Sequence, residues 1–444
     1  AATGSAVGLG NIWRFPYLTG ENGGGAFVLV YLFCVVMMGI PIMMAEILLG
    51  RRGRKSPVNT MHTLAAEEGL NSNWFLLGWL GVIAGFIILS YYSVIAGWTI
   101  AFIFKTGMGD FIGSNADQTT AIFSELISNP VVLLFWHSIF MFLTIYVVSR
   151  GVKSGLEKAV KFLMPALFIL LLIMVAYAMS TEKFLDGLKY LFVPDFGSLA
   201  NKNLFSDVFL PALGQAFFSL SIGMGAIMIY GSYLSKESSI TFNCSVIALA
   251  DTGVAILAGV AIFPIVFTYG LEPSGGPGLI FVSLPIAFGQ MPLGTFFGCL
   301  FFILLMFAAW TSSISLLEPA VTWMVENRKM TRYRAAYIAG FIAWLLGLLT
   351  VLSFNHWAFK FSFAGKTYEN GLFDIFDVLT ANIMLPLGGV LIAIFTSWLM
   401  SRSSTIDELG LSDSIAYKIW RFIIRYVAPL GVVVIFFNAM GLFS

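Results

Sequence analysis

The chain has 444 residues, of which 59% are hydrophobic and 11% are charged. Soluble domains carry roughly 25% charged residues, and apolar runs of about 20 residues recur here, so the composition predicts a polytopic membrane protein. The net charge of +1 excludes nucleic-acid binding by bulk electrostatics. No nucleotide-binding GxxxxGK[ST] loop or HExxH zinc motif occurs, which argues against an ATP-driven pump and a membrane metalloprotease.

Polar residues divide the apolar sequence into eleven predicted membrane-spanning helices. In chain order these helices cover residues 1–20, 25–50, 74–106, 131–149, 156–179, 206–234, 241–270, 294–325, 333–353, 372–400 and 414–441. They predict an all-α polytopic membrane fold. The apolar part of residues 271–293 is too short to span a membrane, so we expect it to form an external cap that folds back onto the protein.

The distribution of Lys and Arg predicts the orientation of the chain. Of the 24 basic residues, 17 fall in the loops of one side, for example Arg51, Arg150, Arg328 and Arg402. Cytoplasmic loops carry the excess of basic residues. We therefore expect a cytoplasmic N-terminus and, after eleven crossings, an external C-terminus.

A short pattern occurs twice in the chain. Residues 6–10 read Ala-Val-Gly-Leu-Gly and residues 221–225 read Ser-Ile-Gly-Met-Gly, each in the first helix of a possible five-helix half. Glycine interruptions at matching places predict broken helices around a site at the membrane midplane. The alternative is close helix packing through small residues.

Several oxygen-bearing residues lie at or opposite these predicted breaks. Asn11 follows the first pattern, Ser219 and Ser221 lie at the second, and residues 311–313 supply three consecutive hydroxyls. Broken helices expose carbonyls that attract cations, and hard cations such as sodium bind several oxygens. The alternative is that each hydroxyl donates to the carbonyl four residues earlier in its own helix.

Charged residues inside the predicted helices are expensive and therefore indicate function. Asp251 has apolar neighbours on both sides, so it either balances a bound sodium, carries a proton or has a structural role. We expect Glu46 and Glu318 to satisfy backbone groups freed by the breaks. Arg14 and Asp377 lie toward the outer ends of their helices, where they are expected to pair across an external vestibule.

The motifs resemble those of the neurotransmitter:sodium symporters. Residues 5–17 (SAVGLGNIWRFPY) and 21–27 (ENGGGAF) are similar to the first-helix signature of that family. Residues 39–41, 214–221 and 311–313 extend the resemblance over nearly the whole chain. Eleven predicted helices are similar to the bacterial branch, which implies the inner membrane of a bacterium.

The resemblance implies a leucine-transporter-like fold of two inverted five-helix repeats in which helices 1 and 6 are broken. The implied divisions are a first repeat over 1–179, an external loop over 180–205, a second repeat over 206–401 and a last helix over 402–444. The implied activity is sodium-coupled import of amino acids by alternating access.

The resemblance also implies two sodium sites. The first would share the substrate carboxylate and use Ala6, Asn11, Ser219 and Asp251. The second would use Gly4, Val7, Ala308, Thr311 and Ser312.

Carried over by position, the family pattern implies a substrate site between the two breaks. The expected contacts are Ala6, Gly8, Leu9, Gly10, Ile88, Tyr92, Phe218, Ser219, Ser221, Met224, Ser312 and Leu316. Monoamine members have an aspartate where this chain has Gly8, which leaves room here for a carboxylate. The apolar side-chain pocket implies hydrophobic L-amino acids, from leucine to tryptophan.

The family pattern implies gates as well. Arg14 and Asp377 would form the outer gate, and Tyr233 and Glu326 would belong to the inner one. We expect the Asp251 carboxylate to replace the chloride ion that animal members require. Proton coupling through Asp251 is the alternative transport mechanism, and a channel or ligand-sensing protein is the alternative class. An enzyme is least favoured, because no set of nucleophile, base and orienting group can be assembled.

Overall fold

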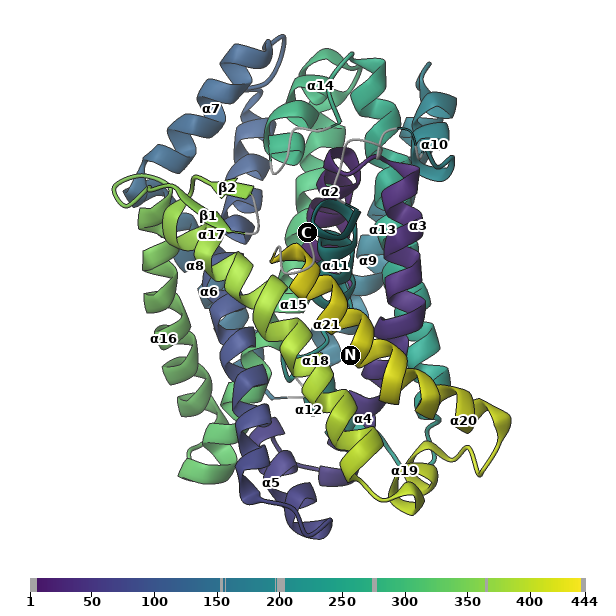
Figure 1. Cartoon of the computed structure of the whole chain (residues 1–444). Coiled ribbons are helices and arrows are strands. Elements are labelled where there is room, and N and C mark those ends of the chain that lie inside the picture. The colour runs from purple at the N-terminus through teal and green to yellow at the C-terminus, as the bar shows by residue number, and fades with distance from the viewer. Residues whose placement is uncertain are drawn as a thin grey trace.

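A computed structural model describes residues 6–151, 155, 157–195, 197, 204–273, 278–363 and 366–440 (Figure 1). Gly4, one of the expected sodium ligands, lies outside these residues. Long helices run side by side through the molecule, and their mutually packed faces form one continuous apolar core. Within the described residues, nine helical segments are long and apolar enough to cross a membrane.

Six of these nine segments contain a single long α-helix. They are α6 (Phe75–Met108), α8 (Pro130–Ser149), α9 (Lys158–Met179), α13 (Ile240–Thr268), α15 (Gly294–Arg328) and α16 (Arg332–Ser353). A short 3-10 turn, η3 (Ser72–Trp74), leads into α6.

The other three segments contain wider π-helical turns. The first joins α3 (Gly25–Cys34), η2 (Val35–Gly39) and α4 (Ile40–Gly53). The second joins α17 (Gly371–Asp377), η8 (Val378–Met384), α18 (Leu385–Ile394) and η9 (Phe395–Leu399). The third joins α20 (Ile415–Phe422), η10 (Ile423–Val427) and α21 (Ala428–Ala439). Both ends of each of the nine segments lie within four residues of the ends of a predicted helix.

The predicted helices at 1–20 and 206–234 are shorter pieces in the structure. The first covers residues 6–21 and is called the first segment from here on. It contains bends at Val7 and Gly8, followed by η1 (Gly10–Arg14) and α2 (Phe15–Glu21). The second contains η6 (Leu204–Phe209), α11 (Leu210–Ser219) and α12 (Ala226–Tyr233). Residues 6–16 and 212–232, which include the chain between α11 and α12, are buried.

The chain between α11 and α12 cannot continue as a helix. Ser221, Gly223 and Gly225 have φ angles of 57°, 78° and 74°, in the left-handed region that glycine adopts without strain. The N–H of Gly223 donates to the Glu46 carboxylate at 2.9 Å. The prediction that Glu46 satisfies freed backbone is therefore confirmed.

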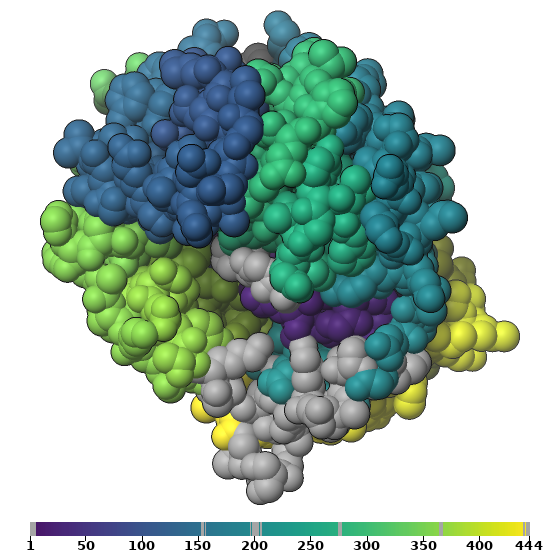
Figure 2. Space-filling view, turned by 90° about the horizontal axis from the view of Figure 1, so that it is seen from above, coloured from purple at the N-terminus to yellow at the C-terminus, as the bar shows by residue number. Residues whose placement is uncertain are grey.

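One end of the bundle carries α7 (Ala116–Ser128), α10 (Phe184–Phe192), α14 (Leu284–Gln290) and a small hairpin (Figure 1). The hairpin pairs β1 (Phe361–Phe363) with β2 (Lys366–Tyr368) in antiparallel register, with Phe361 opposite Tyr368. Seen from this end, the first segment lies at the bottom of a hollow whose rim includes α14 (Figure 2).

The expected cap contains η7 (Leu279–Ser283) and α14. Leu279, Ile280 and Phe281 are buried, and the Phe281 ring lies 5.5 Å from the ring of Trp98 on α6. The short apolar helix therefore folds back onto the bundle, because its length does not allow it to cross a membrane.

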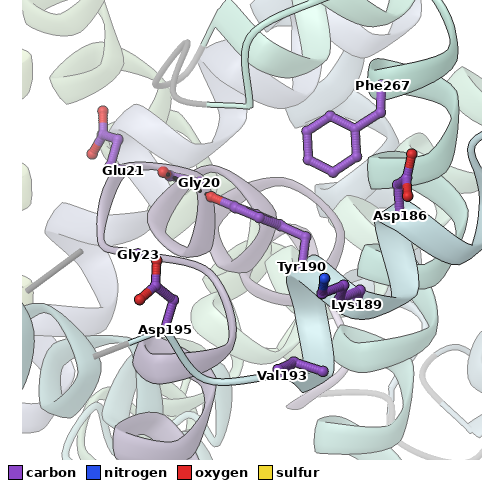
Figure 3. A pocket seen from close by; sticks show the side chains of 9 residues that line it. All are labelled: Gly20, Glu21, Gly23, Asp186, Lys189, Tyr190, Val193, Asp195 and Phe267. Atoms are coloured by element: carbon purple, nitrogen blue, oxygen red, sulfur yellow. Dashed lines mark hydrogen bonds between the residues drawn. The ribbon is translucent and has the colours of Figure 1, made fainter. Parts of the chain in front are cut away.

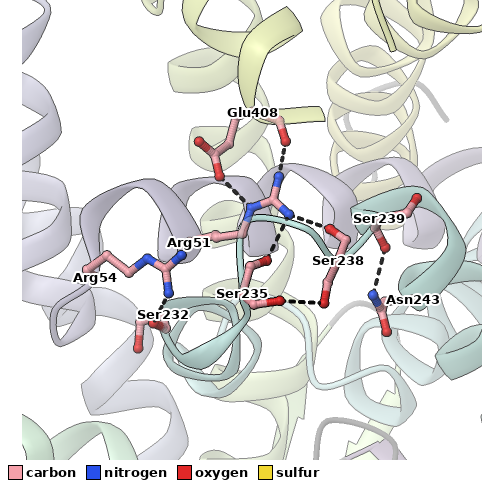
Figure 4. A network of polar contacts seen from close by, with 8 residues as sticks. All are labelled: Arg51, Arg54, Ser232, Ser235, Ser238, Ser239, Asn243 and Glu408. Carbon is pink, nitrogen blue, oxygen red and sulfur yellow. Dashed lines mark hydrogen bonds and ion pairs between the residues drawn. The ribbon is translucent and has the colours of Figure 1, made fainter. Parts of the chain in front are cut away.

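At the opposite end, α5 (Pro57–Glu67) and α19 (Arg402–Leu409) lie among the loops that carry most of the basic residues. Here the buried Arg51 guanidinium joins three segments (Figure 4). Its Nε lies 2.5 Å from Glu408 Oε1, and it also donates to the Glu408 carbonyl. It donates to the Ser238 carbonyl at 2.5 Å as well. Arg51 thus links α4, α19 and the loop after α12.

We predict that Arg51→Ala lowers the melting temperature of the purified protein by several degrees. Removing one partner of a buried ion pair leaves the other charge uncompensated, at about 3–5 kcal/mol. Arg52→Ala is the matched control, because Arg52 forms an exposed pair with Glu67 at 3.1 Å that contributes about 0–1 kcal/mol. Equal melting temperatures for the two variants would contradict the prediction.

Candidate functional site

A small cavity lies where the first segment meets α6, α15 and the chain between α11 and α12. Its volume is about 20 Å³, room for about one water molecule. Its lining consists of Ala6, Gly8, Gly10, Ile88, Tyr92, Phe218, Ser221, Met224, Ser312 and Leu316. The structure thus brings ten of the twelve expected substrate contacts around one cavity. The other two, Leu9 and Ser219, lie next to lining residues in the chain.

One side of this cavity is polar. The Tyr92 hydroxyl accepts a hydrogen bond from the Leu9 N–H at 3.1 Å. A Cβ atom added at Gly8 would lie 2.1 Å from Ser312 Oγ and 3.0 Å from the Tyr92 hydroxyl. Any side chain at position 8, including the aspartate of monoamine transporters, would therefore collide with these hydroxyls.

The remaining wall is apolar. Ile88, Phe218, Met224 and Leu316 are all buried, and the ten lining residues include no charged side chain. A ligand with a charged side chain would lose hydration here without gaining a partner.

Beside the cavity, three polar residues from different elements meet in one buried cluster. Asn11 Nδ2 donates to Asp251 Oδ1 at 2.7 Å and to Ser219 Oγ at 3.1 Å. The Ser219 hydroxyl donates to Asp251 Oδ2 at 2.6 Å. The Asn11 side-chain oxygen, expected to face a cation, accepts from the Gly8 N–H at 2.8 Å. This first cluster joins the first segment to α11 and α13.

A second cluster of oxygens joins the first segment to α15. Thr311 Oγ1 lies 3.3 Å from the Val7 carbonyl oxygen and 3.0 Å from that of Ala308. Ser312 Oγ lies 3.4 Å from the Val7 oxygen. Thr311 also donates to the Phe307 carbonyl four residues earlier, as the alternative interpretation predicted. Ser313 instead bonds to Thr144 on α8.

The chemistry of these clusters suits sodium. Carbonyl, hydroxyl and carboxylate oxygens are the ligands of hard cations. Among the described residues, no group of three or more His, Cys, Asp and Glu side chains is placed to hold a metal ion. The two clusters are therefore the candidate cation sites in this part of the chain.

Gln215 is a further polar residue at the site, and no role for it follows from the sequence alone. Its side-chain amide donates to the Gly10 carbonyl at 2.6 Å and so holds the first segment against α11. Gln215 precedes Ser219 by four residues, so both lie on one face of the same helix. That spacing is the signal from which its position could have been inferred.

A layer of three side chains begins at Phe218, which lines both this cavity and a second, larger one. An Arg14 guanidinium nitrogen lies 3.5 Å from Asp377 Oδ2, and the guanidinium lies 4.8 Å from the centre of the Phe218 ring. Above this layer, a second cavity of about 560 Å³ is lined by these three residues and by Tyr17 and Tyr368, among others. Arg14 and Asp377 do pair, as expected.

At the other end, the expected inner-gate residues bind different partners. The Tyr233 hydroxyl donates to Glu318 Oε1 at 2.9 Å, and Glu318 also pairs with Arg332. Glu326 accepts from the N–H of Ser56, at the start of α5, at 2.9 Å.

The expectation that Glu318 satisfies freed backbone is wrong. Its two carboxylate oxygens accept from the side chains of Tyr233, Thr322 and Arg332 instead. Arg332 begins α16, and its long side chain reaches back to Glu318 on α15, so its charge is paired. The sequence pattern had predicted a loop at this position.

Another cavity, of about 660 Å³, lies apart from this site, at the end where α2 meets α10 (Figure 3). Tyr190 of α10 points toward α2, and its hydroxyl donates to the Gly20 carbonyl at 3.2 Å. No residue lines both this cavity and the central one.

Nine long apolar helical segments among the described residues, with a small central cavity free of charged side chains, fit a multi-pass membrane transporter. The chain belongs to the sodium:neurotransmitter symporter family, whose family model matches residues 1–113 and 124–443. The protein is thus a sodium-dependent symporter and not an enzyme, and the family prediction is confirmed.

Relatives and one solved structure match over nearly the whole chain. The sodium-dependent transporter YhdH of Bacillus subtilis is 37% identical over 100% of this chain and 96% of its own. A crystal structure of MhsT in complex with L-phenylalanine has a TM-score of 0.90 and 43% identity, covering 99% of this chain and 97% of MhsT. The sodium- and chloride-dependent taurine transporter of Homo sapiens is 26% identical over 94% of this chain and 72% of its own.

We predict that Gly8→Ala lowers the melting temperature of the protein, because the new Cβ would lie 2.1 Å from Ser312 Oγ. Overpacking a buried site of this kind costs about 1–3 kcal/mol. Adding Ser312→Ala removes that oxygen and should recover part of the loss. Gly253→Ala is the control, since nothing lies within 4 Å of a Cβ there. A loss no larger than that of the control would contradict the prediction.

Proposed function

We propose that this protein imports hydrophobic L-amino acids together with sodium by alternating access. The observation that carries the proposal is the central cavity, which is apolar on one side, polar on the other and free of charged side chains. That division matches a zwitterion with an apolar side chain. The L-phenylalanine complex of MhsT, at 43% identity, supports the same class of substrate.

In this proposal the substrate carboxylate lies against the N–H groups of Leu9 and Gly10 and the Tyr92 hydroxyl. Leu9 N–H and Tyr92 already lie 3.1 Å apart at the polar side of the cavity. The substrate amino group would face carbonyls of Ala6, Phe218 and Ser219 and the Ser221 side chain.

The substrate side chain would lie against Ile88, Phe218, Met224 and Leu316. Burial of an aliphatic chain contributes roughly 0.8 kcal/mol per CH₂ group. Met224 has a flexible, polarizable side chain that adapts to different shapes. We therefore propose a range from leucine to tryptophan, for which the walls of the 20 Å³ cavity must move apart.

We propose that sodium binds at both oxygen clusters. The first site would use the Ala6 carbonyl, Asn11, Ser219, Asp251 and the substrate carboxylate. The second would use the carbonyls of Val7 and Ala308 and the hydroxyls of Thr311 and Ser312, with Gly4 as the expected fifth ligand. Because the first sodium and the carboxylate share one site, each raises the affinity of the other.

We further propose eleven crossings of a bacterial plasma membrane, with the N-terminus in the cytoplasm. The two crossings beyond the nine long segments would be broken helices, one containing η1 and α2 and the other α11 and α12. Grouping of the basic loops at the end that carries α5 and α19 supports this orientation. The two inverted repeats would cover residues 1–179 and 206–401.

We propose that transport is independent of chloride. Asp251 is fully buried and accepts from both Asn11 and Ser219, so its carboxylate would supply a fixed negative charge within the first cluster. The same burial makes proton coupling through Asp251 the second candidate mechanism.

Binding of labelled leucine and tryptophan to the purified protein tests the proposal, with sodium titrated against potassium at constant pH. We expect sodium-dependent, mutually competitive binding that is unchanged when gluconate replaces chloride. Binding that persists in potassium but follows pH would favour proton coupling. Binding of neither amino acid would refute the substrate class, and stimulation by chloride would refute the role of Asp251.

We predict that Thr311→Val raises the sodium concentration needed for half-maximal leucine binding about tenfold. The variant loses one oxygen ligand of the sodium, which contributes about 1 kcal/mol or somewhat more. Thr144→Val is the control, because Thr144 is equally buried but bonds to Ser313 and to the Phe140 carbonyl of its own helix, α8. If both variants keep the wild-type sodium dependence, the second sodium site is misassigned.

A further inference from the structure

The last helical segment carries a basic stripe beside a lipid-facing stripe. Exposed apolar side chains recur at spacings of four, three and four residues, which is one face of a helix. They are Ile415, Ile419, Phe422 and Tyr426, with 76%, 54%, 59% and 47% of their surface exposed. Lys418, Arg421 and Arg425 recur at spacings of three and four on the adjoining face.

Arg425 lies within the apolar segment and forms no ion pair with any residue that the structure describes. Its guanidinium carbon lies 4.0 Å from the centre of the Trp398 ring and 5.6 Å from that of Tyr426. Its Nε is buried and has no hydrogen-bond partner among the described residues. Because a guanidinium stays charged in proteins, the aromatic rings offset only part of the cost of placing it here.

Arg421, one turn earlier, bonds only to neutral oxygens in the described structure. Its nitrogens lie 2.6 Å from the Tyr417 hydroxyl, 3.3 Å from Thr405 Oγ1 and 3.1 Å from the Ser397 carbonyl oxygen. These bonds hold the guanidinium in place but do not neutralise it.

The basic groups around this segment outnumber the acids that pair with them. Arg402 and Lys418 share Asp413, with Lys418 Nζ 3.9 Å from the carboxylate. Glu408 is already paired with the buried Arg51. Asp413 is therefore the acid that pairs with Arg402 and Lys418, while Arg421 and Arg425 form no ion pair within the described residues.

Trp398 indicates that this basic cluster lies at the membrane interface. It is half exposed, its indole N–H donates to the Arg425 carbonyl at 3.1 Å, and tryptophans of this kind lie at membrane interfaces. Basic clusters beside a spanning helix attract anionic lipids. A protein partner would have to cover the lipid-facing stripe as well, which the bilayer already does.

We propose that Arg421, Arg425 and Trp398 form a binding site for the headgroup phosphate of an anionic phospholipid. The acyl chains would lie along Phe422 and Tyr426, and the lipid belongs to the cytoplasmic leaflet in the orientation proposed above. Guanidinium N–H groups of Arg421 and Arg425 would donate to the phosphate oxygens.

Native mass spectrometry of the purified protein tests this site, with phosphatidylglycerol or phosphatidylcholine of identical acyl chains added. We expect one phosphatidylglycerol to bind more tightly than phosphatidylcholine. Arg425→Gln and Arg421→Gln should each weaken that binding about fivefold, and Arg425→Lys should keep most of it. The thermal unfolding of the lipid-free variants shows whether they fold as the wild type does.

Arg150→Gln is the matched control. Arg150 also lies over a tyrosine ring, that of Tyr146 at 4.3 Å, but it is outside the basic stripe, so its loss should leave the binding unchanged. Equal affinity of the wild type for the two lipids would overturn the proposal, and so would an equal loss in the control variant. Displacement of the lipid by inorganic phosphate would show a site for free anions instead.

Discussion

The structure depends on one constraint, which is that backbone groups freed inside an apolar bundle must find polar partners. A buried amide without a hydrogen bond costs several kcal/mol in an apolar medium. Where α11 ends at Ser219, the Glu46 carboxylate receives the Gly223 N–H. Where the first segment bends, the side chains of Asn11 and Gln215 bond to the backbone of Gly8 and Gly10. The buried polar residues therefore follow from the interruptions in the helices.

The same interruptions organise the site. Residues 6–11 supply three of the lining residues of the central cavity and contribute to both oxygen clusters, which Asp251 of α13 and Thr311 of α15 complete. In the proposed mechanism one short stretch of backbone thus contacts the substrate and both ions. No long-range relay is needed to link them, because a shift of this stretch changes all three sites together.

Much of this arrangement could be read from the sequence. The nine long segments follow from apolar runs whose ends lie within four residues of the predicted bounds. The repeated glycine pattern predicted the position of the central site, since such glycines favour an interruption of the helix. Side-chain pairings between different helices were missed, such as Arg332 with Glu318 and Arg51 with Glu408. No local pattern shows where a long side chain ends once helices have packed. The π-helical turns were missed for a similar reason, because tertiary packing selects them.

The division of the cavity wall between elements has a consequence for protein engineering. Ile88 and Leu316 line the cavity from α6 and α15 and take part in neither oxygen cluster, and Met224 lies between α11 and α12 without bonding to either cluster. Residues 6–11, by contrast, serve every part of the site at once. A library intended to change the ligand range should therefore vary these three positions and keep the first segment constant. At these three positions the shape of the pocket can change without changing the oxygens of the two proposed sodium sites.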